Sequence, residues 1–213
     1  INWMNADSSL WGYMNSNGIL HEDGGFDVFL HPARFSSDKT GDWFINDTTL
    51  FHYDNDDIQI KQFAITNDDQ KIYVDGFLSN NPEKELNINV YDISLRNINS
   101  LFRIDDFELN GSFNLSSSIK NIYSEMLFSS KALIYGIKLN EYEIGDMSLL
   151  SEWDIDSSRI NMSGGLMNEI HSEEIKINDS YYIPDFKIED QLDLNLFFND
   201  LDIDFLNTFL PED

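Results

Sequence analysis

Cysteine is absent from this chain of 213 residues, which excludes a disulfide framework and any metal site built on thiolates. Basic residues are scarce as well, because 13 Lys and Arg stand against 39 Asp and Glu, for a formal net charge of −26. Such a surface repels phosphates, so we exclude nucleic acid as a partner and disfavour an anionic membrane surface. The sequence also lacks a signal peptide, a lipidation signal and an apolar run of about 18 residues, the length that spans a bilayer. Because the chain begins at Ile1 without a starting Met, we expect it to be a segment of a longer protein.

The residues that are abundant are typical of a folded β protein. Hydrophobic residues make up 41% of the chain and aromatic ones 14%, which is too many for a disordered acidic tail. Four alanines stand against 24 isoleucines and 16 phenylalanines, and β-branched and aromatic side chains fit a pleated sheet better than a helix. The composition therefore predicts an all-β fold.

Strict alternation of apolar and polar residues marks the expected strands and gives each of them one apolar and one polar side. Clusters of turn-forming residues separate these runs, and Asn67–Asp69 between two of them predicts a hairpin. Helical signal is limited to one or two turns at residues 97–103 and 205–210. The alternating runs cover residues 58–65, 71–75, 86–90, 107–110, 175–177, 192–196 and 201–205.

One arrangement occurs twice along the chain: a strand ending in Gly, a break, an alternating strand, and a second strand that runs into a helical turn. The first copy uses residues 72–76 and 86–101, and the second uses 160–164 and 192–209, with residues 173–191 as an insertion. Repeated β units stack on a shared apolar face. We therefore expect one continuous sheet with leading strands in residues 1–25, a first repeat unit in 26–106 and a second in 107–213.

Side chains that could carry chemistry do not form a convincing constellation. The acidic clusters at residues 54–57 and 67–69 lack calcium-loop spacing and coincide with expected turns. No carboxylate pair stands out as the acid and base of a glycosidase. We expect no enzymatic activity, no cofactor and no metal, and we interpret the widely spaced histidines as scattered surface residues: His21, His31, His52 and His171.

The β elements follow one another in a characteristic order through Trp43–Leu50, Ile58–Ile65, Gln70–Ser79, Leu86–Leu95, Phe107–Phe113, Leu133–Asn140, Ile144–Leu149, Trp153, Ile160–Gly164 and Leu192–Phe209. This order resembles the TamB family, the translocation and assembly module of the Bacteroidota type within the AsmA-like group. The resemblance runs through roughly residues 26–213, and the chain departs from the family pattern in its 11 glycines and in the insertion at 173–191.

The resemblance implies an elongated, twisted antiparallel sheet that forms a groove (a β-taco) in the periplasm, within a protein anchored in the inner membrane. The groove is expected to shield the acyl chains of phospholipids that move between the inner and outer membranes. Support of outer-membrane protein assembly, with an outer-membrane barrel partner of the Omp85 type, is also implied. The family carries no catalytic residues.

A lipid groove needs one unbroken apolar face, since burial of each CH₂ group is worth about 0.8 kcal/mol without any polar anchor. The same apolar residues could instead form the closed core of a β-sandwich that binds glycan or protein through exposed aromatics such as Trp3, Trp11 and Tyr13. An enzyme acting on glycosides is a third alternative. The residues that we expect to line the groove are Ile58, Ile60, Ile72, Val74, Leu86, Ile88, Val90, Leu192, Leu194 and Leu196.

Overall fold

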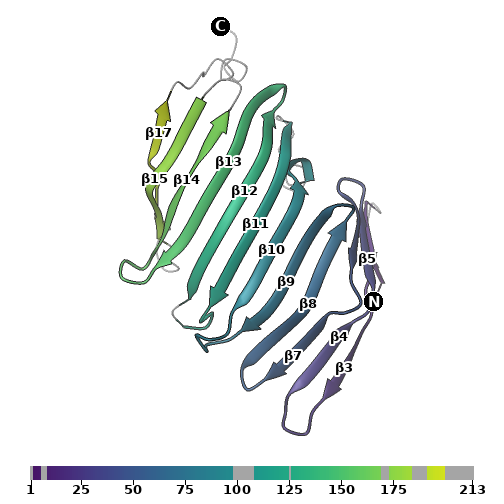
Figure 1. Cartoon of the computed structure of the whole chain (residues 1–213). Helices are drawn as coiled ribbons and strands as arrows, with labels where there is room; N and C mark the ends of the chain where they lie inside the picture. Colours follow the sequence, from purple (N-terminus) through teal and green to yellow (C-terminus); the bar gives the residue numbers. More distant parts are fainter. Residues whose placement is uncertain are drawn as a thin grey trace.

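The computed structural model describes residues 2–5, 9–97, 108–124, 126–168, 173–183 and 191–199. Strands account for 73% of these residues and helix for 2%, which confirms the predicted all-β class. The paired strands are antiparallel and belong to one large, twisted, groove-like sheet that does not close into a barrel (Figure 1).

Strand length divides the sheet into a short-stranded N-terminal part and a long-stranded body. The short strands are β1 (Asn2–Met4), β2 (Leu10–Tyr13), β3 (Ser16–Leu20), β4 (Phe26–Leu30), β5 (Ala33–Ser37), β6 (Gly41–Ile45) and β7 (Leu50–Asp54). The body comprises β8 (Asp57–Asn67), β9 (Gln70–Leu78), β10 (Leu86–Ser94), β11 (Leu109–Lys120), β12 (Leu127–Leu139), β13 (Tyr142–Asp154), β14 (Arg159–Asn168) and β15 (Glu173–Ile183). The short β16 (Gln191–Asp193) and β17 (Leu196–Asn199) follow.

The body is a meander in which each strand from β8 to β15 pairs with the next one along the chain. Both β16 and β17 pair with the far edge of β15. At the other end, β8 carries two branches on its free edge: β7 followed by β4 and β3, and β6 followed by β5, β2 and β1. The first branch lies at the lower right of Figure 1, with β5 of the second branch above it.

The predicted turn clusters are hairpin turns. Asp54 pairs with Asp57 where β7 turns into β8, and Asn67 pairs with Gln70 where β8 turns into β9. Between the latter two, Asp68 has a φ of 49°, a left-handed conformation that Asp and Asn tolerate better than most residues. Turn geometry therefore accounts for both acidic clusters.

Three strands of the body contain a β-bulge that is capped from the neighbouring strand. The registers of β8, β10 and β12 shift near a residue with positive φ, and a side-chain oxygen on the next strand accepts its backbone N–H. Such bulges increase the local right-handed twist of a sheet. The capped pairs are Gln62 with Asp75 at 2.9 Å, Asp92 with Asn114 at 3.2 Å, and Gly136 with Asp146 at 2.7 Å.

The N-terminal end of the sheet curls over its own apolar side. Trp43 in β6 forms one buried cluster with Val90 and Ile93 in β10, although β8 and β9 separate these strands in the sheet. A flat sheet would hold them about 14 Å apart, three strand spacings of roughly 4.8 Å. The cluster therefore requires strong curvature. Phe35, Ile65, Ile72, Phe113 and Leu115 pack against it.

Some expectations from the sequence are refined by the structure. The insertion at 173–191 contains strand β15, which continues the sheet. The first predicted helical segment overlaps a helical turn at residues 95–97, whereas residues 98–107, the second helical segment and the strand at 201–205 lie outside the described residues. The expected boundary between repeat units at 106/107 also lies outside them, and β10 and β11 on its two sides pair in one sheet.

Candidate functional site

Seven of the ten predicted groove residues lie on one side of three neighbouring strands. The registers place Ile88 opposite Val74 and Val90 opposite Ile72, and directly opposed residues share a face of the sheet. Because side chains alternate along a strand, the other members of this set in β8, β9 and β10 point to the same side. We call this side of the sheet the apolar face. Its seven predicted members are Ile58, Ile60, Ile72, Val74, Leu86, Ile88 and Val90.

The apolar face continues across the rest of the sheet as unbroken cross-strand rows. From Val90, the opposed residues in successive strands are Leu115, Ala132, Leu149, Gly164, Ile177 and Leu196. A second row runs from Ile93 through Phe113, Ile134, Met147, Leu166, Ile175 and Phe198. Each row takes six strand spacings, or about 29 Å. That exceeds the roughly 15 Å depth of one leaflet of a bilayer's hydrocarbon core.

A row of small polar side chains lies within the apolar face. Ser117 stands opposite Ile88, and Ser130 and Ser151 follow in the next two strands. The Oγ atom of Ser117 is buried and has no hydrogen-bond partner among the described residues. In the same row, Ser180 is bonded, because its Oγ accepts the N–H of Asn195 at 2.9 Å. Met162 lies between Ser151 and Ser180 in this row.

The remaining three predicted groove residues lie at the far end of the sheet. Leu192 pairs with Tyr182 and Leu196 with Ile177, which places both on the apolar face, and both are exposed. The prediction of one strand over 192–196 is wrong, because Leu194 lies in the connection between β16 and β17. The partner strand has an extra residue there, Asp179, with a φ of 50°, and pairing with it is interrupted between Asp193 and Leu196.

The apolar face is closed at one end and open at the other. The Trp43 cluster buries it near the N-terminal branches, whereas Leu192 and Phe198 at the C-terminal end are 61% and 58% exposed. The accessible surface of the chain is 13,958 Å². A compact monomer of 24.7 kDa would expose only about 10,000 Å². Among the described residues, apolar side chains thus remain uncovered on a single-layer sheet and do not form a closed sandwich core.

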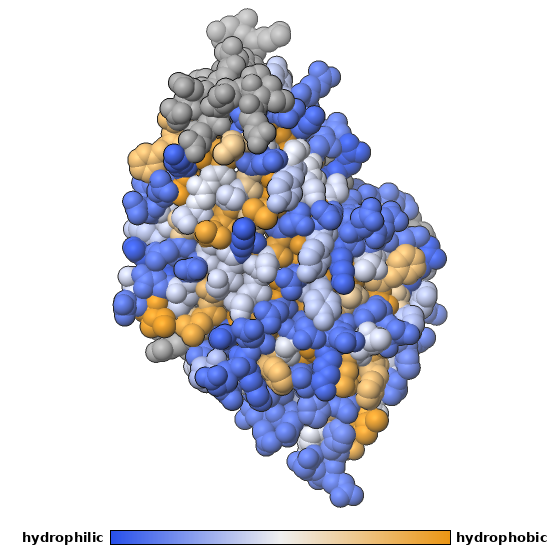
Figure 2. All heavy atoms as spheres, viewed as in Figure 1, coloured by the Kyte–Doolittle hydropathy of each residue, from blue (hydrophilic) through white to orange (hydrophobic). Residues whose placement is uncertain are grey.

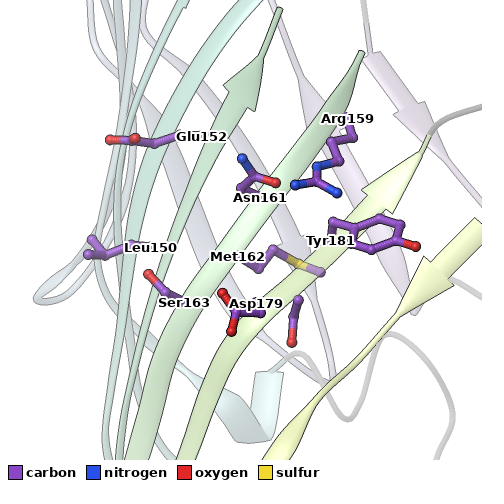
Figure 3. Close-up of a pocket in the computed structure, with 9 residues that line it drawn as sticks. Leu150, Glu152, Arg159, Asn161, Met162, Ser163, Asp179 and Tyr181 are labelled. Carbon is purple, nitrogen blue, oxygen red and sulfur yellow. The ribbon is translucent and has the colours of Figure 1, made fainter. Parts of the chain in front are cut away.

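The opposite side of the sheet carries most of the polar side chains and a hollow of about 480 Å³ over β13, β14 and β15 (Figure 3). Arg159 lies 4.7 Å from the ring of Tyr181 and 3.8 Å from Asp154, whose carboxylate also accepts from Asn161. The pKa of Asp154 is lowered chiefly by a hydrogen bond from Ser157. Arg159, Asn161 and Ser157 thus all contact the carboxylate of Asp154. The side of the molecule shown in Figure 2 is mostly hydrophilic, with smaller apolar patches.

The aromatic residues of the alternative binding-module hypothesis do not share a face. Trp3 stands opposite Gly12 in β2, whereas Trp11 and Tyr13 flank Gly12 and therefore point to the other side. The indole of Trp3 lies over Gly12, where an added Cβ would approach the ring to 2.5 Å. A flat aromatic platform built from all three is thus excluded by the register.

The histidines were expected to be scattered, and this expectation is wrong for two of them. His21 and His52 both lie beside the carboxylate of Asp27, within one group of potential ligand atoms. His31 is exposed after β4 and is not part of that group, and His171 lies outside the described residues. Sequence spacing held no signal for this cluster, since a cross-strand pairing brings its members together.

Comparisons with known proteins give no match, whether to family models, to curated proteins or to solved structures. Among the described residues, helices are too short and too polar to cross a bilayer.

Proposed function

We propose that this chain is a non-enzymatic segment of a TamB-like envelope protein whose apolar face shields phospholipid acyl chains. The observation that carries the proposal is the pair of unbroken apolar rows, which cross six strand spacings without a charged side chain. The setting is the periplasm between the two membranes, where an outer-membrane barrel would be the partner in lipid delivery or protein assembly.

The mechanism follows from what an acyl chain requires. It needs a continuous apolar surface and no specific polar contact, since each buried CH₂ group contributes about 0.8 kcal/mol. Small residues, Ala132 and Gly164, lie along the first row between larger neighbours. A chain bound across the strands could shift from one set of side chains to the next at little cost, because the rows are chemically uniform.

The experiment uses two adjacent phenylalanines of β17 as a matched pair. Phe198 belongs to the second apolar row and Phe197 points to the opposite side, and they are 58% and 56% exposed. Contact with a phenylalanine is worth about 1.5–3 kcal/mol, so Phe198→Asp should lower crosslinking to a phospholipid with a photoreactive acyl chain at least about tenfold. Phe197→Asp should retain crosslinking, and circular dichroism should show the same β spectrum for both variants. Equal crosslinking by the two variants would contradict the proposal.

A further inference from the structure

A second site lies on the polar side of the first branch, where three potential metal ligands converge. Asp27 in β4 and His52 in β7 are directly opposed in the register, and His21 follows the end of β3. His52 Nδ1 lies 2.6 Å from Asp27 Oδ1, and His21 Nε2 lies 3.1 Å from Asp27 Oδ2. The two imidazole rings meet edge to face with 6.1 Å between their centroids.

The turn between β3 and β4 holds His21 in this position. The backbone N–H of His21 donates to the carbonyl of Gly25 at 2.8 Å, and the N–H of Gly24 donates to the carbonyl of His21 at 3.2 Å. Gly24 has a φ of 93°, which other residues rarely adopt, so the turn depends on glycine there. Backbone hydrogen bonds thus fix one imidazole, and the β4–β7 register fixes the other two groups.

The donor set fits one divalent transition-metal ion. One ligand atom from each residue lies within 4.8 Å of the others, and a small shift of the side chains would bring all three to bonds of about 2.0–2.2 Å with one ion. His21 Nε2 is buried, yet its geometry relative to the Asp27 carboxylate does not meet the requirements of a hydrogen bond. This nitrogen is therefore withdrawn from solvent without being satisfied. Two imidazoles and one carboxylate suit zinc and its neighbours, whereas Ca²⁺ and Mg²⁺ prefer oxygen ligands.

We propose that His21, Asp27 and His52 bind one Zn²⁺ ion, with a water molecule completing the coordination. The ion would tie the turn after β3 to β7 across β4 and so stabilise the outermost branch of the sheet. The site lies on the face opposite the apolar rows, so the proposal is independent of lipid binding.

The test is a calorimetric titration of the whole chain, stripped of metal by a chelator, with Zn²⁺ at pH 7.5. Millimolar Mg²⁺ in the buffer occupies the many weak carboxylate sites of a chain with net charge −26. We expect one equivalent of Zn²⁺ per chain and a rise in melting temperature, because the ion binds the folded chain and not the unfolded one. Asp27→Asn should weaken binding at least tenfold, whereas His31→Gln, outside the cluster, should leave it unchanged.

A second measurement keeps the proposal testable if Asp27→Asn fails to fold. X-ray absorption at the zinc edge of the wild-type complex should show two imidazole nitrogens and oxygen ligands at about 2.0–2.2 Å. Absence of stoichiometric binding, or a zinc shell without imidazole, would overturn the proposal and leave a His–Asp–His cluster without a metal in its place.

Discussion

Two serines in the same row of the apolar face should respond to alanine substitution with opposite signs. Ser117 in β11 and Ser180 in β15 are both buried, at 6% and 1% exposure. The hydroxyl of Ser117 has no hydrogen-bond partner among the described residues. The hydroxyl of Ser180 donates to the carbonyl of Asn178 at 3.2 Å and accepts the N–H of Asn195 at 2.9 Å.

The magnitudes follow from the cost of an unpaired buried hydroxyl and the net value of a hydrogen bond. Leaving a buried polar group unpaired costs about 1–3 kcal/mol, so Ser117→Ala should stabilise the chain by about 1 kcal/mol. Each hydrogen bond of Ser180 is worth about 0.5–1.5 kcal/mol, so Ser180→Ala should destabilise it by about 1–2 kcal/mol. For a chain of this size, 1 kcal/mol corresponds to a melting-temperature shift of about 2–4 °C.

Thermal unfolding followed by circular dichroism measures both shifts, and amide hydrogen exchange supplies a local check. Exchange at the N–H of Asn195 should accelerate in Ser180→Ala, because that N–H loses its acceptor. It should be unchanged in Ser117→Ala. A melting temperature lowered by both variants would refute the reasoning, since it would show that the Ser117 hydroxyl is satisfied in solution.

Two further predictions concern backbone geometry and pH. Gly76 has a φ of 123°, and a Cβ there would lie 2.1 Å from the carbonyl oxygen of Glu85. Gly76→Ala should therefore cost roughly 2–5 kcal/mol in urea unfolding, against about 1 kcal/mol for Gly136→Ala, which has open space around it; similar costs would contradict the steric argument. The pKa of Asp57 is lowered chiefly by a hydrogen bond from Lys84, so its contribution to stability is present above the unfolded pKa of about 4 and is lost as pH falls through the folded value. The difference in melting temperature between wild type and Asp57→Asn should be steady above about pH 5 and shrink below pH 4, and a difference independent of pH would contradict this assignment.

Local patterning was sufficient to predict several strands of the body and the side to which their residues point. Ile58, Val74 and Ile88 lie on the apolar face because alternation with a period of two fixes orientation once a strand forms. Turn chemistry was equally informative, as the hairpin at Asn67–Gln70 shows. These signals are local, so a single sequence contains them in full.

Local sequence patterns could not predict which strands pair with each other or in which register. The alternation at 192–196 gave no sign that a bulge in β15 would divide the segment into β16 and β17. The pairing of β4 with β7 instead of β5 decides that Asp27 meets His52, and nothing near either residue in the sequence indicates it. The curl that joins Trp43 to Val90 likewise depends on two branches competing for one edge of β8.

The capped bulges connect the acidic polar side of the sheet to the shape of its apolar side. Asp75 and Asp146 neighbour apolar-face residues along their strands, so they point to the polar side, where their carboxylates accept the N–H groups of Gln62 and Gly136. Without an acceptor for its backbone N–H, the extra residue of a bulge would raise the free energy of the folded chain, and a regular register without the bulge would be favoured. Because these bulges add twist at intervals of two strands, their caps help to curve the sheet. Part of the net charge of −26 thus has a structural role beyond solubility. Carboxylates on the polar side help to curve a sheet whose two apolar rows, on the other side, contain no charged residue.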